Sequence, residues 1–367
     1  MAITDGTVPV RGRILRSVQD FVDDRFAPVG AVFEEGLAGR TDAGAAVCVT
    51  VDGRTVVYLW GGSADAAGIR PWQRDTIVNV YSCTKTMTAL TALLLADRGE
   101  IDLAAPVSRY WPRFAANGKD RVTVAHLLSH SSGLSGWAEP IGAADLYDWE
   151  KVTGLLAAQA PFWPPGTASG YHVLTFGYLV GEVVRRVTGR TLGTVFRQEI
   201  AEPLGADFHI RLPASEDARV AELIPAATGA APFAHPTALQ TNASTNPRLD
   251  VAATRSRVWR GAEIPAGNGT GNARAMATIL AVLACGGVAG GRRLLSGSGL
   301  KAEGERWPPL SSSTAPAMSA GTGIWSRPNC RREAMRPSRR TFPATTTRPG
   351  CPTTRTPWPT RPAAGPI

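Results

Sequence analysis

The first third of the chain shows two hydrophobic patterns, one with the period of a helix and one typical of strands. Apolar residues recur at helical spacing between Arg13 and Phe26, which predicts an amphipathic helix. Two runs rich in β-branched and aromatic residues follow at 45–51 and 55–60, with Asp52-Gly53 between them. Because Asp-Gly favours the positive φ angles of a tight turn, these runs predict a β-hairpin.

Further along, helical patterns end at glycines. A strand-like run at 76–80 leads into a helix that ends at Gly99, where glycine is a natural cap. Apolar residues over 176–187 predict another helix, ended by Gly189. Because antiparallel strands precede these helices instead of alternating with them, the pattern predicts a mixed α/β domain rather than a regular βαβ repeat.

Length and composition describe a globular chain. With 367 residues, 44% of them hydrophobic, it can bury one large core or two modest ones. Its longest apolar run, at 90–96, is too short to cross a bilayer. Residues 1–13 contain no apolar stretch of the kind found in secretion signals, so we expect a cytoplasmic protein. The five cysteines are scattered and fit neither a disulfide framework nor a zinc site.

The positive charge is concentrated at one end. Residues 301–367 hold 11 Lys and Arg and 3 Asp and Glu, so they account for +8 of the net charge of +9. Nucleic-acid-binding domains carry their charge on a folded face, so no nucleic-acid partner is expected, and no membrane partner either. The segment is also rich in Pro and Thr without any helical or strand period. We expect it to be disordered or poorly folded.

Candidate chemistry begins at Ser82 and Lys85, which are three residues apart at the predicted start of a helix. Positions i and i+3 share a helix face, so the hydroxyl and the amine are expected to point into one cleft. A serine nucleophile can be activated by an amine instead of a histidine. Serine and lysine are common, however, and the same spacing also occurs in purely structural helices.

Other polar residues leave alternatives open. Tyr171 follows a Gly/Pro-rich turn and is either a core or interface residue or a phenol held over the nucleophile as a base. His126 and His130 have a spacing that could bind a metal, but they lack the intervening glutamate and a third ligand, so no metal is expected. The glycine loop at 263–271 does not match a dinucleotide fingerprint, and no cofactor is expected.

Taken together, these motifs resemble the serine β-lactamase-like superfamily, and within it the class-C-like branch of family VIII carboxylesterases. The resemblance covers roughly residues 10–300. The matching pieces are Ser82-Cys83-Thr84-Lys85, Gly99-Glu100-Ile101-Asp102-Leu103 with Pro106-Val107, Leu127-Leu128-Ser129-His130-Ser131-Ser132-Gly133-Leu134, Pro165-Gly166-Thr167, Tyr171-His172-Val173-Leu174-Thr175-Phe176-Gly177 and Ala262-Glu263-Ile264-Pro265-Ala266-Gly267-Asn268-Gly269.

The resemblance implies an α+β fold, with an antiparallel sheet flanked by helices and an inserted helical subdomain. It also implies a catalytic role for three residues: Ser82 as the nucleophile, Lys85 as its activating partner and Tyr171 as a second base. An ammonium beside the phenol would lower the pKa of Tyr171 from about 10 and favour a phenolate. The hydrolase domain would then span residues 1–300, lacking its last strands, with the tail at 301–367.

Two departures from the family pattern bear on function. Val173 stands where many relatives have asparagine, which removes a polar contact to substrate amides and favours ester hydrolysis. The third motif, K-T-G or H-x-G, should lie well beyond residue 300, but the last histidine is His235 and Lys301 is followed by Ala-Glu. We therefore expect an incomplete carboxyl-terminal part. The tail is interpreted as an out-of-frame translation, with a genuine disordered basic extension as the alternative.

The sequence thus predicts a serine hydrolase that cleaves small carboxylic esters through an acyl-serine. Hydrolysis of a β-lactam or another amide is the alternative within the same fold. A catalytically impaired, truncated relative is the alternative of a different class. The partner in all but the last case is a small-molecule ester or amide; the acyl group, the alcohol and the oligomeric state are not predicted.

Overall fold

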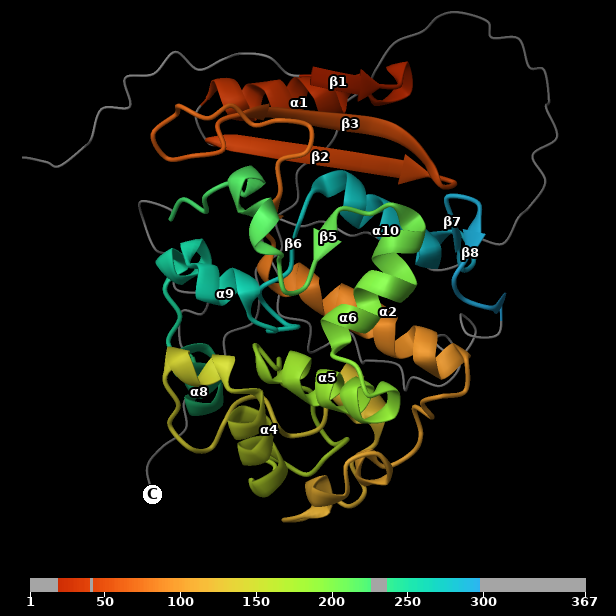
Figure 1. The fold of residues 1–367 in the computed structure, drawn as a ribbon, viewed down its shortest axis with the longest axis vertical. Coiled ribbons are helices and arrows are strands. Elements are labelled where there is room, and N and C mark those ends of the chain that lie inside the picture. Colours follow the sequence, from red (N-terminus) through yellow and green to blue (C-terminus); the bar gives the residue numbers. More distant parts are fainter. Residues whose placement is uncertain (1–18, 40–41, 226–235, 298–367) are drawn as a thin grey trace, which may run out of the picture. The chain divides into compact units, whose positions relative to one another are not determined.

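The computed structural model describes residues 19–39, 42–225 and 236–297, which all belong to one compact unit of the chain (Figure 1). The predicted boundary at residue 300, the tail at 301–367 and the expected loss of the last strands lie outside these residues. Nothing in this part of the chain therefore tests them.

An antiparallel sheet forms the upper layer in Figure 1. It consists of β1 (Gln19–Val22), β2 (Gly44–Val51) and β3 (Arg54–Gly62) in the order β1-β3-β2. Strands β2 and β3 form the predicted hairpin, with Val47 opposite Leu59. Asp52 and Gly53 join them with φ angles of 50° and 74°, which is the backbone that a tight right-twisted hairpin requires.

The prediction of a helix between residues 13 and 26 is wrong for the part of that range that the structure describes. Within the described part of that range, Gln19–Val22 is the edge strand β1, and the helix α1 begins later, at Ala27–Ala38. The segment pairs with β3, with Phe21 opposite Tyr58. Pairing with a strand some forty residues away overrides the local helical spacing, as tertiary context often does for short segments.

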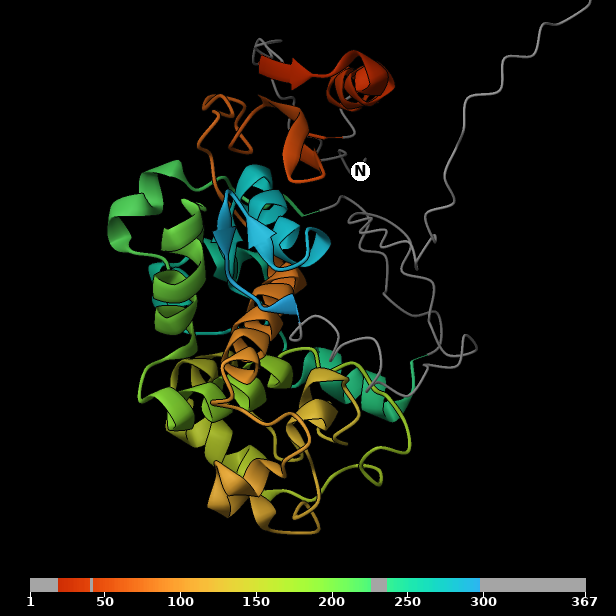
Figure 2. The ribbon, with the colours of Figure 1, turned by 90° about the vertical axis from the view of Figure 1, so that its right-hand side faces the viewer.

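Helices cover the two faces of this sheet (Figure 2). On one face Phe33 of α1 packs with Val57 and Leu59 of β3. On the other, the guanidinium of Arg274 from α10 (Ala273–Ala284) lies 5.7 Å from the centre of the Tyr58 ring. Successive residues of a strand point to opposite faces of the sheet, so β3 contacts α1 with side chains on one face and α10 with side chains on the other.

The main core lies among the helices below the sheet. It joins α2 (Thr84–Asp97), α4 (Trp149–Ala158), α5 (Thr175–Thr188), α6 (Leu192–Phe196) and α10. As predicted, α2 is followed by Gly99 and α5 by Gly189, with φ angles of 75° and 69°. Glycine adopts this left-handed conformation without strain, which explains why both helices end there.

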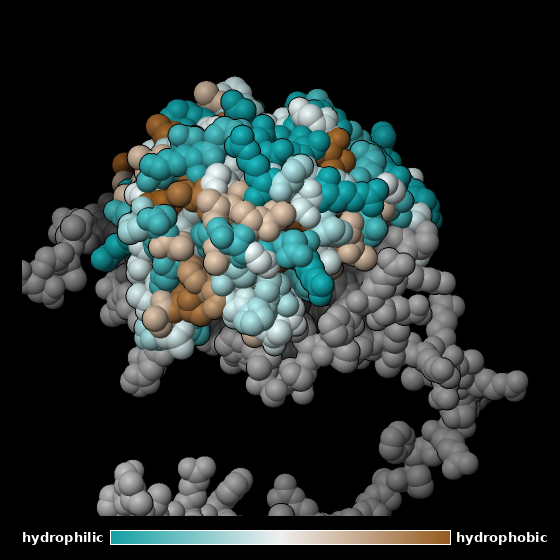
Figure 3. All heavy atoms as spheres, turned by 90° about the horizontal axis from the view of Figure 1, so that it is seen from below, coloured by the Kyte–Doolittle hydropathy of each residue, from teal (hydrophilic) through white to brown (hydrophobic). Residues whose placement is uncertain are grey.

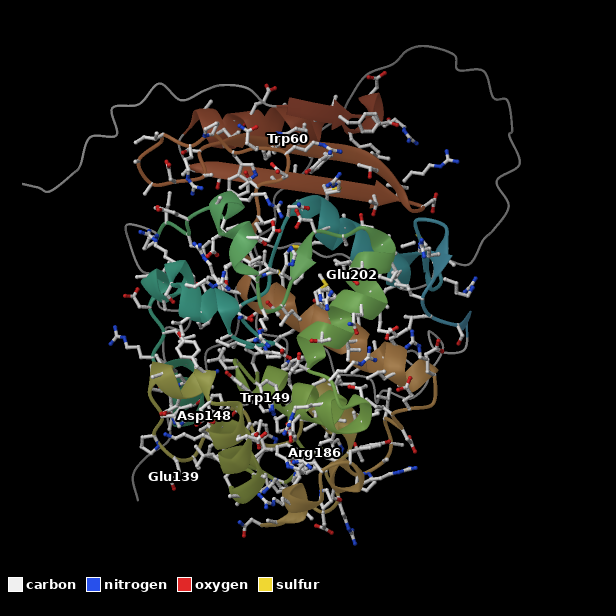
Figure 4. The ribbon with its side chains drawn as sticks, viewed as in Figure 1. Trp60, Glu139, Asp148, Trp149, Arg186 and Glu202 are labelled. Atoms are coloured by element: carbon white, nitrogen blue, oxygen red, sulfur yellow. The ribbon has the colours of Figure 1, made fainter. Side chains whose placement is uncertain are left out.

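A buried carboxylate links α4 to α5. Glu182 is 1% exposed and accepts hydrogen bonds from Trp149 Nε1 at 2.7 Å, Arg185 Nε at 2.8 Å and Arg186 Nε at 2.7 Å. Figure 4 labels Trp149 and Arg186 where the two helices meet. A charge so deep is tolerated only when its oxygens are paired in this way.

The remaining helices and strands are short. They are α3 (Val124–Leu128), α7 (Glu202–Leu204), α8 (Ala238–Thr245), α9 (Arg257–Gly261), β4 (Val78–Asn79), β5 (Phe208–His209), β6 (Thr270–Gly271), β7 (Val288–Ala289) and β8 (Arg292–Arg293). Further 3-10 turns lie at Asp24–Phe26, Tyr81–Cys83, Val107–Arg109, Pro112–Ala115, Ala143–Tyr147, Ala214–Arg219 and Val251–Arg255, and a π-helical segment at Arg197–Ala201. The order β4-β6-β5 defines a second antiparallel sheet.

The arrangement confirms the predicted α+β class, with antiparallel sheets flanked by helices. The face at the helical end is mostly hydrophilic, with apolar residues in small separate groups (Figure 3). Across the described ranges, every helix is too short or too polar to cross a membrane.

Candidate active site

Ser82 lies at the junction between β4 and α2, in the 3-10 turn Tyr81–Cys83. The turn is tied to a distant loop, because Val80 N–H donates to the oxygen of Gly269 at 2.8 Å. In return, Thr84 Oγ1 accepts the Gly269 N–H at 2.8 Å and donates to the carbonyl of Tyr81 at 2.5 Å. Tyr81 has a φ of 43°, a conformation that side chains rarely adopt and that functional sites often hold.

Lys85 is buried directly behind the serine. Its side chain is 7% exposed, whereas Ser82 is exposed. Lys85 Nζ lies 3.1 Å from Ser82 Oγ, 2.6 Å from the oxygen of Val173 and 3.0 Å from the oxygen of Ala266. The predicted pair is therefore brought together, and two main-chain carbonyls complete the surroundings of the amine.

Tyr171 borders the same place. Lys85 Nζ lies over the face of its ring, 4.9 Å from the centroid, and the phenol is near enough to Ser82 for that side chain to affect its pKa. The side chain is 46% exposed. The structure thus gathers all three residues that the sequence singled out, at the amino-terminal end of α2.

The pKa shifts of Lys85 and Tyr171 differ from the expectation. Burial lowers the pKa of Lys85 from 10.5 to about 7, and burial raises the pKa of Tyr171, with the nearby Ser82 side chain opposing the rise. The prediction of a phenolate favoured by an ammonium is therefore wrong. The amine lies over the face of the ring and is itself desolvated, so burial and not mutual attraction decides both pKa values.

The loop that supplies the Ala266 carbonyl is fixed by buried amides. Asn268 Nδ2 donates to the oxygens of Trp259 and Ala262, and its Oδ1 accepts the N–H of Ile264 at 3.1 Å. Asn79 donates to the oxygen of Gly267 at 3.1 Å. Sequence reasoning assigned neither asparagine a role. Asn268 lies in the glycine loop at 263–271, which marks the segment as unusual, whereas the residues around Asn79 give no such signal.

The two histidines considered as metal ligands have other partners. His126 Nδ1 accepts the N–H of Thr123 at 3.2 Å and so caps α3. His130 Nδ1 accepts the N–H of His172 at 3.1 Å, and its ring lies 5.0 Å from that of Tyr171. Within the described ranges, no three His, Cys, Asp or Glu side chains are grouped so that they could hold a metal ion. His172, which sequence reasoning passed over, adjoins Tyr171 and is fully buried.

The two departures from the family pattern fall in different parts of the chain. Val173 packs its side chain partly against the main core, and only its carbonyl oxygen reaches Lys85. Lys301 and the range in which a third motif was sought lie outside the described residues. Chemically, the described part offers an exposed hydroxyl beside a buried amine whose pKa lies near neutrality, with a phenol that can donate a proton.

Comparison with known proteins places these residues in a family. The family model described as beta-lactamase matches residues 29–327. The chain is 41% identical over 294 residues to Esterase/beta-lactamase LipL of Mycobacterium tuberculosis, covering 77% of this chain and 68% of that protein. It is 34% identical over 198 residues to Esterase EstB of Burkholderia gladioli, covering about half of each, at 49% and 50%.

Solved structures agree with these relatives. A family VIII carboxylesterase superposes with a TM-score of 0.73 and 45% identity, covering 78% of this chain and 76% of that one. A penicillin-binding protein homologue from Caulobacter crescentus superposes with a TM-score of 0.73 and 40% identity, covering 78% and 76%. The predicted β-lactamase/transpeptidase-like fold and the predicted enzyme class, serine hydrolase, are confirmed. With its family model matched over most of its length, the chain belongs to the beta-lactamase family.

Proposed function

We propose that the chain hydrolyses small carboxylic esters through an acyl-serine formed on Ser82. The observation that carries the proposal is the setting of Lys85 Nζ, which lies 3.1 Å from Ser82 Oγ and within 3.0 Å of two carbonyl oxygens. Since its pKa is about 7, a large share of the amine is neutral at physiological pH and can accept a proton.

The two carbonyl oxygens fix the orientation of the neutral Lys85 amine. The oxygens of Val173 and Ala266 can only accept hydrogen bonds, so they hold the two N–H groups of the amine. The third neighbour, the Ser82 hydroxyl, can donate, so the lone pair of Nζ faces its proton. Lys85 thus takes the proton from Ser82 Oγ as that oxygen attacks the ester carbonyl.

Tyr171 acts as the acid in the same step. Because its pKa is raised, the phenol remains protonated and can donate a proton to the alkoxide that leaves as the ester C–O bond breaks. The Lys85 ammonium then returns a proton to the phenolate. In the tetrahedral intermediate, the negative oxygen accepts the main-chain N–H of Ser82, among the donors of an oxyanion hole. Water, deprotonated by the same amine, then attacks the acyl-serine, and the Lys85 ammonium returns that proton to Ser82 Oγ as the C–Oγ bond breaks and the acid is released.

The absence of a side-chain amide at position 173 supports esters over lactams. Val173 offers substrate no polar side-chain contact, so an amide substrate gains nothing there. Two of the similar proteins are named esterase and a third a family VIII carboxylesterase. Hydrolysis of a β-lactam is the second candidate, since the name of LipL includes both activities.

Catalytic impairment is the remaining alternative, because no third motif is visible in the sequence of the tail. The reading of that tail as out of frame stays a prediction that the nucleotide sequence tests. A cytoplasmic location, and the absence of nucleic-acid and membrane partners, also stay predictions.

One set of assays separates the three functions. Wild type and Ser82→Ala are compared on p-nitrophenyl butyrate and on a chromogenic cephalosporin, and the acylated protein is weighed by mass spectrometry. Ester turnover above the alanine variant, with an acyl mass on Ser82, supports the proposal. Faster turnover of the cephalosporin favours the second candidate, and no turnover of either leaves the impaired form.

A further inference from the structure

We infer that His130 is a positioning residue, which clamps the segment on both sides of Tyr171 and so holds the phenol against Ser82; this rests on the proposed function. Two hydrogen bonds carry the inference. The N–H of Gly170, just before the tyrosine, donates to the oxygen of His130 at 3.0 Å. The N–H of His172, just after it, donates to His130 Nδ1 at 3.1 Å.

The backbone of His130 is bent so that one residue can make both bonds. Its φ is 60°, in the left-handed region, where a residue other than glycine is strained. Such strain persists only where the surrounding structure over-determines it. Here the carbonyl and the ring of His130 both face the chain at 170–172, some forty residues away in sequence.

His172 is fixed in turn, so the clamp has a rigid counterpart. Its ring is fully buried, with Nε2 2.8 Å from Ser132 Oγ and Nδ1 2.5 Å from the oxygen of Gly170. The carbonyl can only accept, so Nδ1 carries the proton and Nε2 accepts the Ser132 hydroxyl. Both nitrogens are used within the protein, which leaves His172 a structural role next to Tyr171.

Ring packing restricts the tyrosine further. The His130 ring lies 5.0 Å from the Tyr171 ring and 4.9 Å from the Phe176 ring, between centroids. Burial lowers the pKa of His130 to about 3, so the imidazole is neutral and its Nδ1 lone pair is available to the His172 N–H. One residue thus fixes the main chain on either side of the phenol and the position of its ring.

Two substitutions of His130 separate the effect of losing the hydrogen-bond acceptor from the effect of the left-handed backbone. Asparagine tolerates a left-handed φ and places a carbonyl oxygen near the position of Nδ1, whereas glycine tolerates the same φ and offers no acceptor. We expect kcat on p-nitrophenyl butyrate to fall about 10- to 100-fold in His130→Gly, because small misplacements of reacting groups cost about that much. We expect His130→Asn to recover most of the loss.

A double-mutant cycle shows whether His130 acts through the phenol. In a Tyr171→Phe background the same His130→Gly change should alter kcat by no more than about 2-fold, since no phenol remains to be positioned. His126→Gly is the matched control, because His126 Nδ1 also accepts a main-chain N–H but caps α3 instead. It should lower thermal stability and leave kcat unchanged.

Several results would overturn the inference while leaving the proposed function intact. These are equal kcat values for His130→Gly and His130→Asn, or an equal loss with and without the Tyr171 hydroxyl. A second readout does not depend on turnover. Amide hydrogen exchange over residues 170–173 should be faster in His130→Gly than in His130→Asn, and equal exchange contradicts the clamp. If wild type turns over no ester, the proposed function fails, and exchange still decides on the clamp.

Discussion

The buried amine should leave a measurable trace in protein stability. Unfolding returns Lys85 to water, where its pKa is 10.5, whereas in the folded protein burial lowers it to about 7. Between these two values the unfolded chain binds a proton that the folded protein does not. Stability therefore rises with pH in this window, at about 1.4 kcal/mol per unit, and this contribution is flat below pH 7 and above 10.5.

The substitution Lys85→Met removes this term and keeps the length of the side chain. Relative to the methionine variant, wild type should gain about 2 kcal/mol in free energy of unfolding from pH 7 to pH 9. Any constant difference, such as the loss of hydrogen bonds to two carbonyls, cancels in this comparison. Other titrating groups cancel as well, because both proteins contain them.

Urea unfolding followed by tryptophan fluorescence at pH 7, 8 and 9 gives the required free energies. A gap between wild type and Lys85→Met that stays constant within error across this range would refute the reasoning. It would mean that the folded protein keeps Lys85 as an ammonium with an ordinary pKa. Direct proton transfer from Ser82 to a neutral amine would then have no support.

Further predictions concern the reaction and the fold. The kcat/KM for p-nitrophenyl butyrate should rise about 10-fold from pH 6 to pH 8 as Lys85 loses its proton, and a flat profile would contradict this. Tyr171→Phe should lower kcat by about 100-fold or more in steady-state assays, since it removes the proton donor. Glu182→Gln should cost about 1.5–3 kcal/mol in urea unfolding. Arg185 and Trp149 hold the pKa of Glu182 below 4.5 against the effect of burial. The stability difference between wild type and Glu182→Gln should therefore disappear as the pH falls below 4.5. Gly53→Ala should cost about 1–2 kcal/mol because φ is 74°, while Gly154→Ala, in the middle of α4 with open space around it, should stabilise; equal effects would argue against the turn.

The sequence predicts well the features that depend only on residues close to one another in the chain. The Asp52-Gly53 turn and the glycines at 99 and 189 have conformations that their own residue types favour, so a short stretch suffices to identify them. Ser82 and Lys85 share one helical turn, so their proximity also follows from spacing. Tyr171 comes from a distant loop, where the local pattern left its role open, and the resemblance to a family favoured its association with the pair.

Features set by distant contacts were missed or misplaced. Strand β1 exists because β3 lies beside it, and the apolar spacing of the segment gives no sign of that pairing. His130 appeared as a possible metal ligand because its neighbours in sequence include a second histidine. Its actual partners, at 170 and 172, lie about forty residues away. The direction of the Lys85 pKa shift depends on burial from all sides, which no local pattern reveals.

The acceptors of the Lys85 amine belong to the main chain, and this has a consequence for sequence variation. A carbonyl oxygen is present whatever side chain a residue carries, so changes at 173 and 266 that keep the backbone path leave the setting of the amine intact. Substitutions at these two positions should therefore leave the lowered pKa of Lys85 unchanged as long as the backbone path is kept.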